Sequence, residues 1–498
     1  MHFIFRYTTM LKKFIYTSLM TLVLASCSES VMDDINKDEA NPPVDIVDAK
    51  FQLTDAIVST AFTTYGGPYA WYVSSYTEQS FGTGNNQLMK TELRQRTETA
   101  GSSTFNNEWN GTYANLYNIK YILEKCAEGG VNAGQNDIEG MAQVLWCLNF
   151  EALTDLHGDI PYSEALGVSK NPKLDKQADI YKDLCTRIDN AITLLTGAAA
   201  EGMNNAKGQD FLYGGDPAKW VGLAQAVKAR LYLNQGFRDA SAYATAKTAA
   251  EAAAAAGFSG AELSIFNGVD CDNSWTAYQW SRYYVGANKT VADLMEQRED
   301  PRLDIYAADM FGTGVACAPA GDADLAGQTE YVGFPVWLDN GAATIHVFSL
   351  SELYFILAET KARAGEDASA DLTAAVEASF ADYAAASGEE VSGADTYVAA
   401  LGDATLDEVM VQKYIAQARD EVIQTYNDIR RFKAEGKSYV TLNNPNNERG
   451  GKNQWPLRLP YGNSDVVSNP NVAAAFGSGN NAGEYLFTEN IWLFGGER

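Results

Sequence analysis

The sequence is poor in the residues that build metal centres. It has three histidines, His2, His157 and His346, and six cysteines among 498 residues. His2 falls in an N-terminal segment that we expect to be removed, so a three-histidine site is excluded. No CxxC or Cys/His spacing suggests zinc, and no acidic stretch matches an EF-hand loop. No cofactor is predicted. The sequence does not decide whether Asp and Asn side chains in loops bind a Ca²⁺ ion.

Positive charge is also scarce. The chain has 37 Lys and Arg against 64 Asp and Glu, which gives a net charge of −27. This charge repels a phosphate backbone, so no nucleic-acid partner is predicted. The GxSxG, GxxxxGK[ST] and HExxH templates are absent. Because so many acidic residues guarantee some close carboxylate pairs, their abundance is no evidence for glycoside hydrolysis. We therefore predict that the protein is not an enzyme.

Long hydrophobic runs are missing from the body of the chain, and the one apolar segment lies at its start. Lys12 and Lys13 precede FIYTSLMTLVL (14–24), which has the length of a signal peptide rather than a membrane span. The run closes with LASC, which resembles the lipobox of bacterial lipoproteins, in which the cysteine, here Cys27, becomes the acylated first residue. We predict three parts: a signal peptide (1–26), a lipidated N-terminus and tether (27–44) and a single domain (45–498).

Most of the remaining chain has helical periodicity. Trp220, Leu223, Val227 and Leu231, for example, recur at the spacing of one helix face. The pattern predicts helices at 105–128, 137–156, 177–196, 216–235, 239–257, 349–364, 369–386 and 404–434. Helices joined in pairs by short loops resemble a TPR-like stack, so we expect a mainly α fold.

Long irregular stretches rich in Gly, Asn, Ser and aromatic residues separate these helices. They cover 63–104, 258–288, 310–348 and 436–498. Loops of this length are often functional, and we expect a few short strands within them, for example around 341–348.

One polar cluster resembles a metal site or an acid/base pair. In EALTDLHGDIPYSEAL (151–166), Asp155, His157 and Asp159 crowd together where an apolar helix ends. Gly158 and the following Ile-Pro step are typical of a helix end and a turn. We interpret the cluster as a structural corner that performs no reaction.

The same stretch carries a family resemblance. TDLHGDIPYSEAL (154–166) is similar to a signature of SusD/RagB-type outer-membrane lipoproteins, and the chain resembles that family in further segments in the expected order. These segments are 299–307, 331–335, 349–365, 412–431 and 456–472. One departure is Tyr426, which stands where family members often have tryptophan.

The resemblance implies a SusD-like helical fold and a glycan-binding lipoprotein anchored at the outer-membrane surface. Such a protein hands oligosaccharide to a SusC-like TonB-dependent transporter. In this family the TPR-like pairs usually face the transporter, and irregular loops hold the sugar.

Two aromatic clusters in the irregular stretches are candidate sugar platforms, because sugars pack C–H faces on aromatic rings and need polar partners for their hydroxyls. The first, CDNSWTAYQWSRYY (271–284), offers Asn273, Trp275, Tyr278, Trp280, Arg282, Tyr283 and Tyr284. The second, GGPYAWYVSSYTEQ (66–79), offers Tyr69, Trp71, Tyr72, Tyr76 and Gln79. Trp337 is a weaker third candidate.

Two alternative functions stay open at this point. A surface-anchored glycosidase needs two carboxylates placed in an open cleft. A helical-repeat scaffold that binds peptides or proteins needs a broad apolar groove instead of scattered aromatic platforms.

Overall fold

The computed structural model describes residues 47–83, 87–94, 105–282, 285–309, 317–321 and 333–498. Residues Ala49–Arg498 form one compact unit. The predicted signal peptide, Cys27 and the tether lie outside the described residues, so these boundaries stay a prediction. In the described part of the chain, no helix is both long and apolar enough to cross a bilayer.

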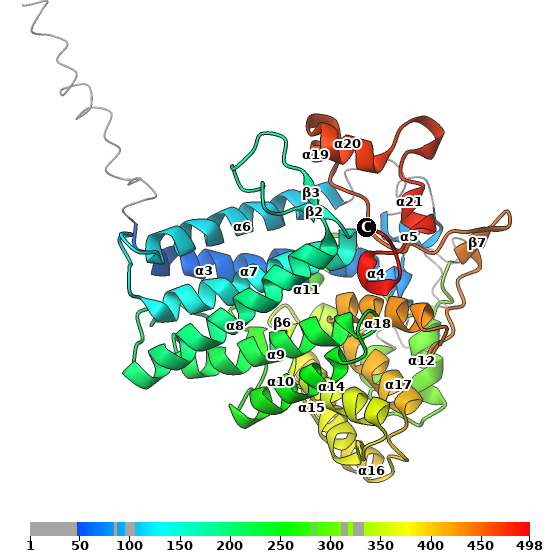
Figure 1. The fold of residues 1–498 in the computed structure, drawn as a ribbon. Helices are drawn as coiled ribbons and strands as arrows, with labels where there is room; N and C mark the ends of the chain where they lie inside the picture. The colour runs from blue at the N-terminus through cyan, green and yellow to red at the C-terminus, as the bar shows by residue number, and fades with distance from the viewer. Residues whose placement is uncertain (1–46, 84–86, 95–104, 283–284, 310–316, 322–332) are drawn as a thin grey trace, which may run out of the picture. The chain divides into compact units, whose positions relative to one another are not determined.

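The fold is mainly α-helical, as predicted. Its body is a row of long helices in which neighbours along the chain lie side by side (Figure 1). They are α3 (Ala49–Ser59), α6 (Asn106–Cys126), α7 (Asn136–His157), α8 (Gln177–Glu201), α9 (Pro217–Gln235), α10 (Ala242–Ala255), α14 (Leu350–Ala364) and α15 (Ser369–Ser387). Helices α6 to α10 pack each on the next, and α10 then packs on α14. This succession of packed pairs is the TPR-like arrangement that the periodicity predicts.

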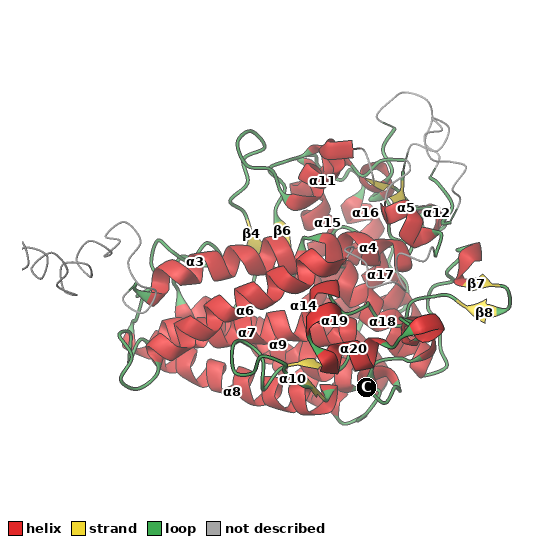
Figure 2. Cartoon of the chain, turned by 90° about the horizontal axis from the view of Figure 1, so that it is seen from above, coloured by secondary structure: helices red, strands yellow, loops and turns green. Residues whose placement is uncertain are grey.

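Shorter elements surround this row (Figure 2). The helices are η2 (Thr60–Tyr65, a π-helix), α4 (Pro68–Tyr76), α5 (Gln87–Glu92), α11 (Ser274–Arg282), α12 (Lys289–Glu296), α13 (Leu303–Tyr306), η7 (Val336–Asp339), α16 (Ala394–Ala399), α17 (Leu406–Gln417), α18 (Val422–Ala434), η8 (Pro445–Asn447), α19 (Asn463–Ser468), α20 (Pro470–Phe476), η9 (Gly479–Asn481), α21 (Tyr485–Thr488) and η10 (Trp492–Phe494). The strands form antiparallel pairs: β1 (Phe81–Gly82) with β5 (Val285–Gly286), β2 (Ile160–Pro161) with β3 (Leu174–Asp175), β4 (Ala261–Leu263) with β6 (Ile345–Phe348), and β7 (Glu448–Arg449) with β8 (Lys452–Asn453).

Local sequence explains where the long helices begin and end. Asp216 caps α9 by accepting a hydrogen bond from the N–H of Ala218, and Pro217 takes the first helical position. Ser349 caps α14 in the same way, and that helix ends at Gly365 in the left-handed conformation (φ 73°). The predicted helices other than 404–434 are therefore confirmed, with ends that shift by a few residues.

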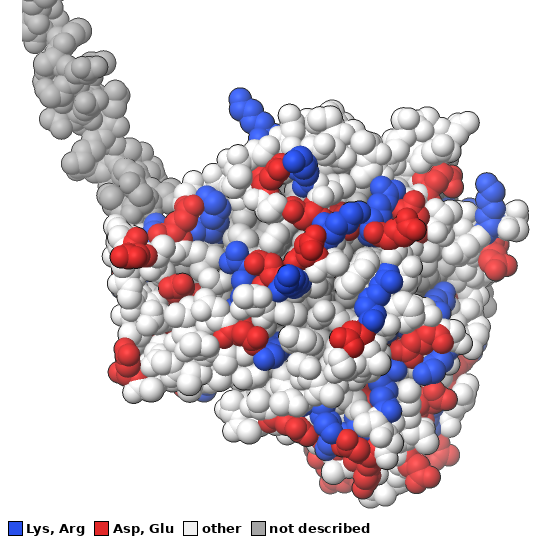
Figure 3. All heavy atoms as spheres, viewed as in Figure 1, with Lys and Arg blue, Asp and Glu red and all other residues white. Residues whose placement is uncertain are grey.

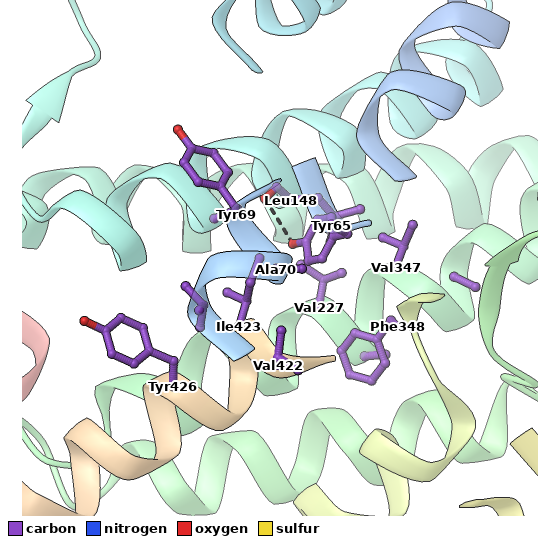
Figure 4. Close-up of a cluster of buried hydrophobic side chains, with 14 of the residues drawn as sticks. Tyr65, Tyr69, Ala70, Leu148, Val227, Val347, Phe348, Val422, Ile423 and Tyr426 are labelled. Atoms are coloured by element: carbon purple, nitrogen blue, oxygen red, sulfur yellow. Dashed lines mark hydrogen bonds between the residues drawn. The ribbon is translucent and has the colours of Figure 1, made fainter. Parts of the chain in front are cut away.

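The core lies where the helix row meets η2, α4 and α18 (Figure 4). Tyr65, Leu148, Val227 and Phe348 are all buried there. The Tyr65 hydroxyl donates to the carbonyl oxygen of Leu148 at 3.1 Å, so even the polar end of this ring has a partner. Apolar burial of this extent supplies most of the free energy that holds the fold together.

Two expectations about secondary structure are wrong. Residues 404–434 are not one helix, because the chain divides into α17 and α18. Between them, Arg419 donates to the carbonyl oxygen of Thr344 at 2.5 Å, and Asp420 accepts from the N–H of His346 at 3.0 Å. These two contacts tie the turn to β6.

The stretches 63–104 and 258–288 are also less irregular than expected, since they contain α4 and α11. Pro68 occupies the first position of α4, directly after Gly67. Asn273 precedes α11 and accepts a hydrogen bond from the N–H of Thr276, which caps the helix. These are ordinary start signals that the glycine- and serine-rich composition obscures.

The polar cluster at 151–166 is a corner of the fold, as interpreted. His157 is fully buried, where its Nε2 lies 3.1 Å from the Tyr69 hydroxyl, and burial lowers its pKa to about 3. The Asp155 carboxylate accepts from Tyr181 at 2.5 Å and from Asn427 at 2.7 Å. Gly158 has φ 83°, and a Cβ atom there would lie 2.9 Å from Arg458. These contacts hold α7 against the C-terminal segment.

A buried cluster of charges joins α14 to α17 and α18. The Glu359 carboxylate contacts Arg431 at 2.5 and 3.0 Å and Arg363 at 2.7 Å, and Lys413 pairs with Asp428 at 2.7 Å. Burial alone would raise the pKa of Glu359, but the positive charges of Arg431, Arg363 and Lys413 lower it instead. The carboxylate is therefore ionised and fully paired inside the protein.

Removing one charge from this cluster should destabilise the protein strongly. Glu359→Gln removes one of the two carboxylates that contact Arg431, the other being Asp428 at 2.5 Å. The buried cluster then carries uncompensated positive charge, so we expect the free energy of unfolding to fall by about 3–5 kcal/mol. Urea denaturation followed by circular dichroism measures it. The matched control is Glu366→Gln, because Glu366 pairs with Lys247 at 2.6 Å with its side chain 47% exposed. Its cost should stay below about 1 kcal/mol, and equal losses in the two variants would contradict the argument.

His346 on β6 is surrounded by carboxylates. Its Nδ1 lies 3.1 Å from Asp420, and its Nε2 lies 3.6 Å from Asp382 and 3.7 Å from Glu262. Burial lowers the pKa of His346, and so does the neighbouring Arg419, but Asp420 and Asp382 outweigh both and raise it to about 9. The imidazole is thus positively charged at neutral pH.

This raised pKa makes stability depend on pH. Since the unfolded histidine has a pKa of about 6.5, the stabilisation is complete below that pH and is lost as the pH rises through about 9. We expect the wild type to lose about 3 kcal/mol relative to His346→Gln between about pH 6.5 and pH 10. Urea titrations across this range test it. His157→Gln is the control, because a histidine with a pKa of about 3 is neutral throughout; parallel curves for wild type and His346→Gln would refute the assignment.

Candidate functional site

The two predicted aromatic clusters come together in the folded protein, although about two hundred residues separate them in sequence. The Ser274 hydroxyl donates to the carbonyl oxygen of Gly66 at 2.5 Å, which joins the start of α11 to the segment before α4. The strands β1 and β5 then pair just beyond the two helices, with Phe81 opposite Gly286. Close approach requires a small residue at position 66, because a Cβ atom there would lie 2.9 Å from Ser274 and Ile345.

The centre of this site is a stacked pair of rings, one from each cluster. Trp71 on α4 and Tyr278 on α11 have ring centroids 4.1 Å apart and planes inclined by 11°. Trp275 meets Trp71 edge-on at 6.5 Å and is itself buried. Trp71 and Tyr278 are half-buried, so the stack reaches the protein surface. We call Trp71, Trp275 and Tyr278 the ring stack.

Trp280 follows on the same helix and is 52% exposed. A single exposed ring is ordinary, but one on the same helix as the surface stack adds to its aromatic surface. Flat aromatic faces beside polar groups suit the C–H faces of a sugar ring better than they suit a charged ligand.

Near the ring stack, one polar side chain supports the fold, and two indole N–H groups have no hydrogen-bond acceptor among the described residues. Asn273 donates from Nδ2 to the carbonyl oxygen of Asn340 at 2.9 Å, so it holds α11 in place. The indole N–H groups of Trp71 and Trp275 are buried, and no acceptor for them lies among the described residues. Burial raises the pKa of Asp339, which belongs to the neighbouring η7. On the face shown in Figure 3, acidic and basic side chains are interspersed, without a large patch of one sign.

Several predicted site residues are not available to a ligand. Tyr76 is buried under the guanidinium of Arg94 and accepts through its carbonyl oxygen from Trp455. Trp337 is buried between Tyr306 and Tyr383. Both rings belong to the core because their helices turn them inward.

Tyr69 and Tyr72 are buried as well. Tyr283 and Tyr284 lie outside the described residues, and so does the side chain of Arg282. Sequence reasoning missed Phe62, a 38% exposed ring on η2 whose one signal is its place shortly before the glycine pair.

Metal-ligating side chains do not cluster in the described part of the chain. No three His, Cys, Asp or Glu side chains gather there as they would around a metal ion. The cysteines of this part are free, and Cys126 and Cys147 are buried, as expected of thiols in apolar helices.

Comparison with known proteins places the chain in a family. Residues 52–461 match a SusD-like family model described as "Starch-binding associating with outer membrane". A SusD/RagB family protein from Bacteroides thetaiotaomicron has a similar crystal structure, with 31% sequence identity and a TM-score of 0.79. The similarity covers 91% of this chain and 100% of that one.

Two further solved structures share the fold. One is a chitin-binding protein with 22% identity and a TM-score of 0.70, over 89% of this chain and 99% of that one. The other is a chitin-binding SusD homologue from Flavobacterium johnsoniae, with 19% identity and a TM-score of 0.70, over 89% and 98%. A search of proteins with curated descriptions gives no match. The family match over most of the chain and the shared fold agree: the chain belongs to the SusD-like family.

Proposed function

We propose that the protein captures oligosaccharide at the cell surface and passes it, uncleaved, to a SusC-like TonB-dependent transporter. The observation that carries the proposal is the surface stack of Trp71 and Tyr278 with the exposed Trp280 beside it. Parallel rings on two joined helices form a rigid apolar platform, and rigid aromatic platforms are a common way to hold sugars.

The relatives support a carbohydrate as the ligand. The family model describes starch binding, and two structures with the same fold are named for chitin binding. Starch and chitin differ in the linkage and substituents of their sugars but share the apolar faces of pyranose rings. We therefore propose a glycan ligand without naming its linkage or length.

The remaining parts of the proposal concern place and partner. A diacylated or triacylated Cys27 would fix the protein to the outer membrane, because several acyl chains anchor far more firmly than one. The family's association with the outer membrane supports the proposed delivery to a transporter.

Removing the exposed ring should weaken glycan binding without unfolding the protein. We expect Trp280→Ala and Trp71→Ala to lower the affinity for the best-binding oligosaccharide of a glycan panel about tenfold or more. Isothermal titration calorimetry measures it.

Phe211→Ala is the matched control, because Phe211 is a 44% exposed aromatic residue in the loop between α8 and α9. Affinity that survives both tryptophan substitutions would contradict the proposed platform. Chromatography of the same mixtures tests catalysis, and sugar released by the wild type would exclude a purely binding role.

Loss of the proposed anchor should free the protein from the membrane. In the native bacterium, we expect Cys27→Ser to abolish acylation and to move the protein from the membrane fraction to the soluble fraction. Mass spectrometry of the mature N-terminus and fractionation measure this. Cys271→Ser serves as the control, because Cys271 is an exposed free thiol within the folded unit. A Cys27→Ser protein that stays membrane-bound would rule out the anchor.

A further inference from the structure

A pocket of about 640 Å³ lies between α18 and the β7–β8 hairpin, which projects beyond the end of α18 in Figures 1 and 2. Its lining residues come from 429–455, and none belongs to the ring stack. Among them are Lys433, Tyr439, Asn444, Asn447 and Trp455. The volume is sufficient for one or two sugar units.

The pocket contains a lysine without a counter-charge. The ammonium of Lys433 lies over the ring of Trp455, 3.9 Å from its centroid. Among the described residues, no carboxylate lies within ion-pair distance of Lys433. Lys437, in the same pocket, differs in this respect because Glu435 lies 3.1 Å from its ammonium. A cation held on an aromatic face with no anion beside it is suited to a negatively charged ligand.

A second cation adds to this charge. Arg94 donates to the side-chain oxygen of Asn447 at 2.7 Å and makes no ion pair in the described part of the chain. Burial raises the pKa of its neighbour Glu92 to about 8, so that carboxyl group is mostly neutral at pH 7. The lining residues include one carboxylate, Glu448, which is exposed and is followed by Arg449. Lys433 and Arg94 thus place two cations at this pocket in a chain with a net charge of −27, and Glu448 and the buried Glu78 are the carboxylates near them.

The pKa of Lys433 also favours an anionic ligand. Lys433 is exposed to solvent, but its neighbours partly desolvate it, which lowers its pKa. The positive charge of Arg94 lowers the pKa further, while Glu78 opposes both effects. An anion in the pocket would remove part of this cost.

The other lining groups suit a sugar rather than a simple ion. Asn444, Asn447 and Asn453 line the same pocket. The side chains of Asn444 and Asn453 already form hydrogen bonds with Glu92, Asn446, Phe487 and Trp455. The Nδ2 of Asn447 makes no hydrogen bond among the described residues. Tyr439 and Phe432 add aromatic surface. This aromatic surface suits the apolar face of a sugar ring, and the free amide donor of Asn447 suits a hydroxyl group.

We propose that this pocket is a second ligand site, which binds a sugar unit that carries a carboxylate or a sulfate group. The inference rests on the proposed glycan binding and extends it to acidic glycans. Lys433 contacts the charged group, and the amide Nδ2 of Asn447 donates to a hydroxyl. Because the lining residues of the pocket and the ring stack have no member in common, the two sites are separable by substitution.

Ligand-observed NMR titration with glucuronate, glucose 6-sulfate, glucose and inorganic sulfate tests the proposal. We expect the wild type to bind glucuronate or glucose 6-sulfate at least about tenfold more tightly than glucose and inorganic sulfate, and more weakly as salt increases. Of the two acidic sugars, the tighter binder shows whether the site takes a carboxylate or a sulfate. If glucose or inorganic sulfate binds as well as both acidic sugars, the proposal is overturned.

Substitutions identify the residue responsible. Lys433→Met, which keeps the length of the side chain, should lower the affinity for the acidic sugar about tenfold or more, and Lys433→Arg should retain it. Lys437→Met is the matched control, because Glu435 already neutralises that lysine. Unchanged thermal unfolding confirms that the variants are folded.

The ring stack distinguishes this inference from the proposed function. Trp280→Ala should leave acidic-sugar binding intact, even if the glycan panel reveals no ligand for the rings. Binding that survives Lys433→Met, or that Trp280→Ala abolishes, would exclude a second site at this pocket.

Discussion

The position of α18 against the helix row depends on the buried ion pair between Glu359 and Arg431. Glu359 lies on α14, within the helix row, and binds Arg431 on α18. Helix α18 packs in turn on α4, which carries Trp71. A buried ion pair is directional, and leaving one of its charges unpaired is costly, so it fixes how α18 packs against the row. The position of the ring stack therefore follows from a charge that is far from it in sequence.

The long helices could be predicted from the sequence, because each has its own apolar face and its own start and end signals. Trp220 and Leu223 repeat at helical spacing, and Asp216 and Gly365 cap their helices without help from the rest of the fold. The break between α17 and α18 could not be predicted in this way. It depends on Arg419 and Asp420 reaching β6, which lies more than seventy residues earlier.

The candidate site was predictable in composition but not in detail. Trp71, Tyr278 and Trp280 stand in aromatic-rich segments and are half-buried or exposed, and their contact with a ligand stays a prediction. Tyr76 and Asn273 come from the same segments and instead support the fold, because a local pattern does not show which side of a short helix faces inward. The pocket beside Lys433 was missed altogether, since an asparagine-rich loop resembles an ordinary turn.

The joined helices α4 and α11 also affect the thermodynamics of any ligand that reaches the rings. The planes of Trp71 and Tyr278 are nearly parallel before binding, and the hydrogen bond from Ser274 to Gly66 holds their helices together. Few rotamers remain to be frozen, so association loses little conformational entropy and needs no induced fit. A rigid platform of this kind selects ligands by shape.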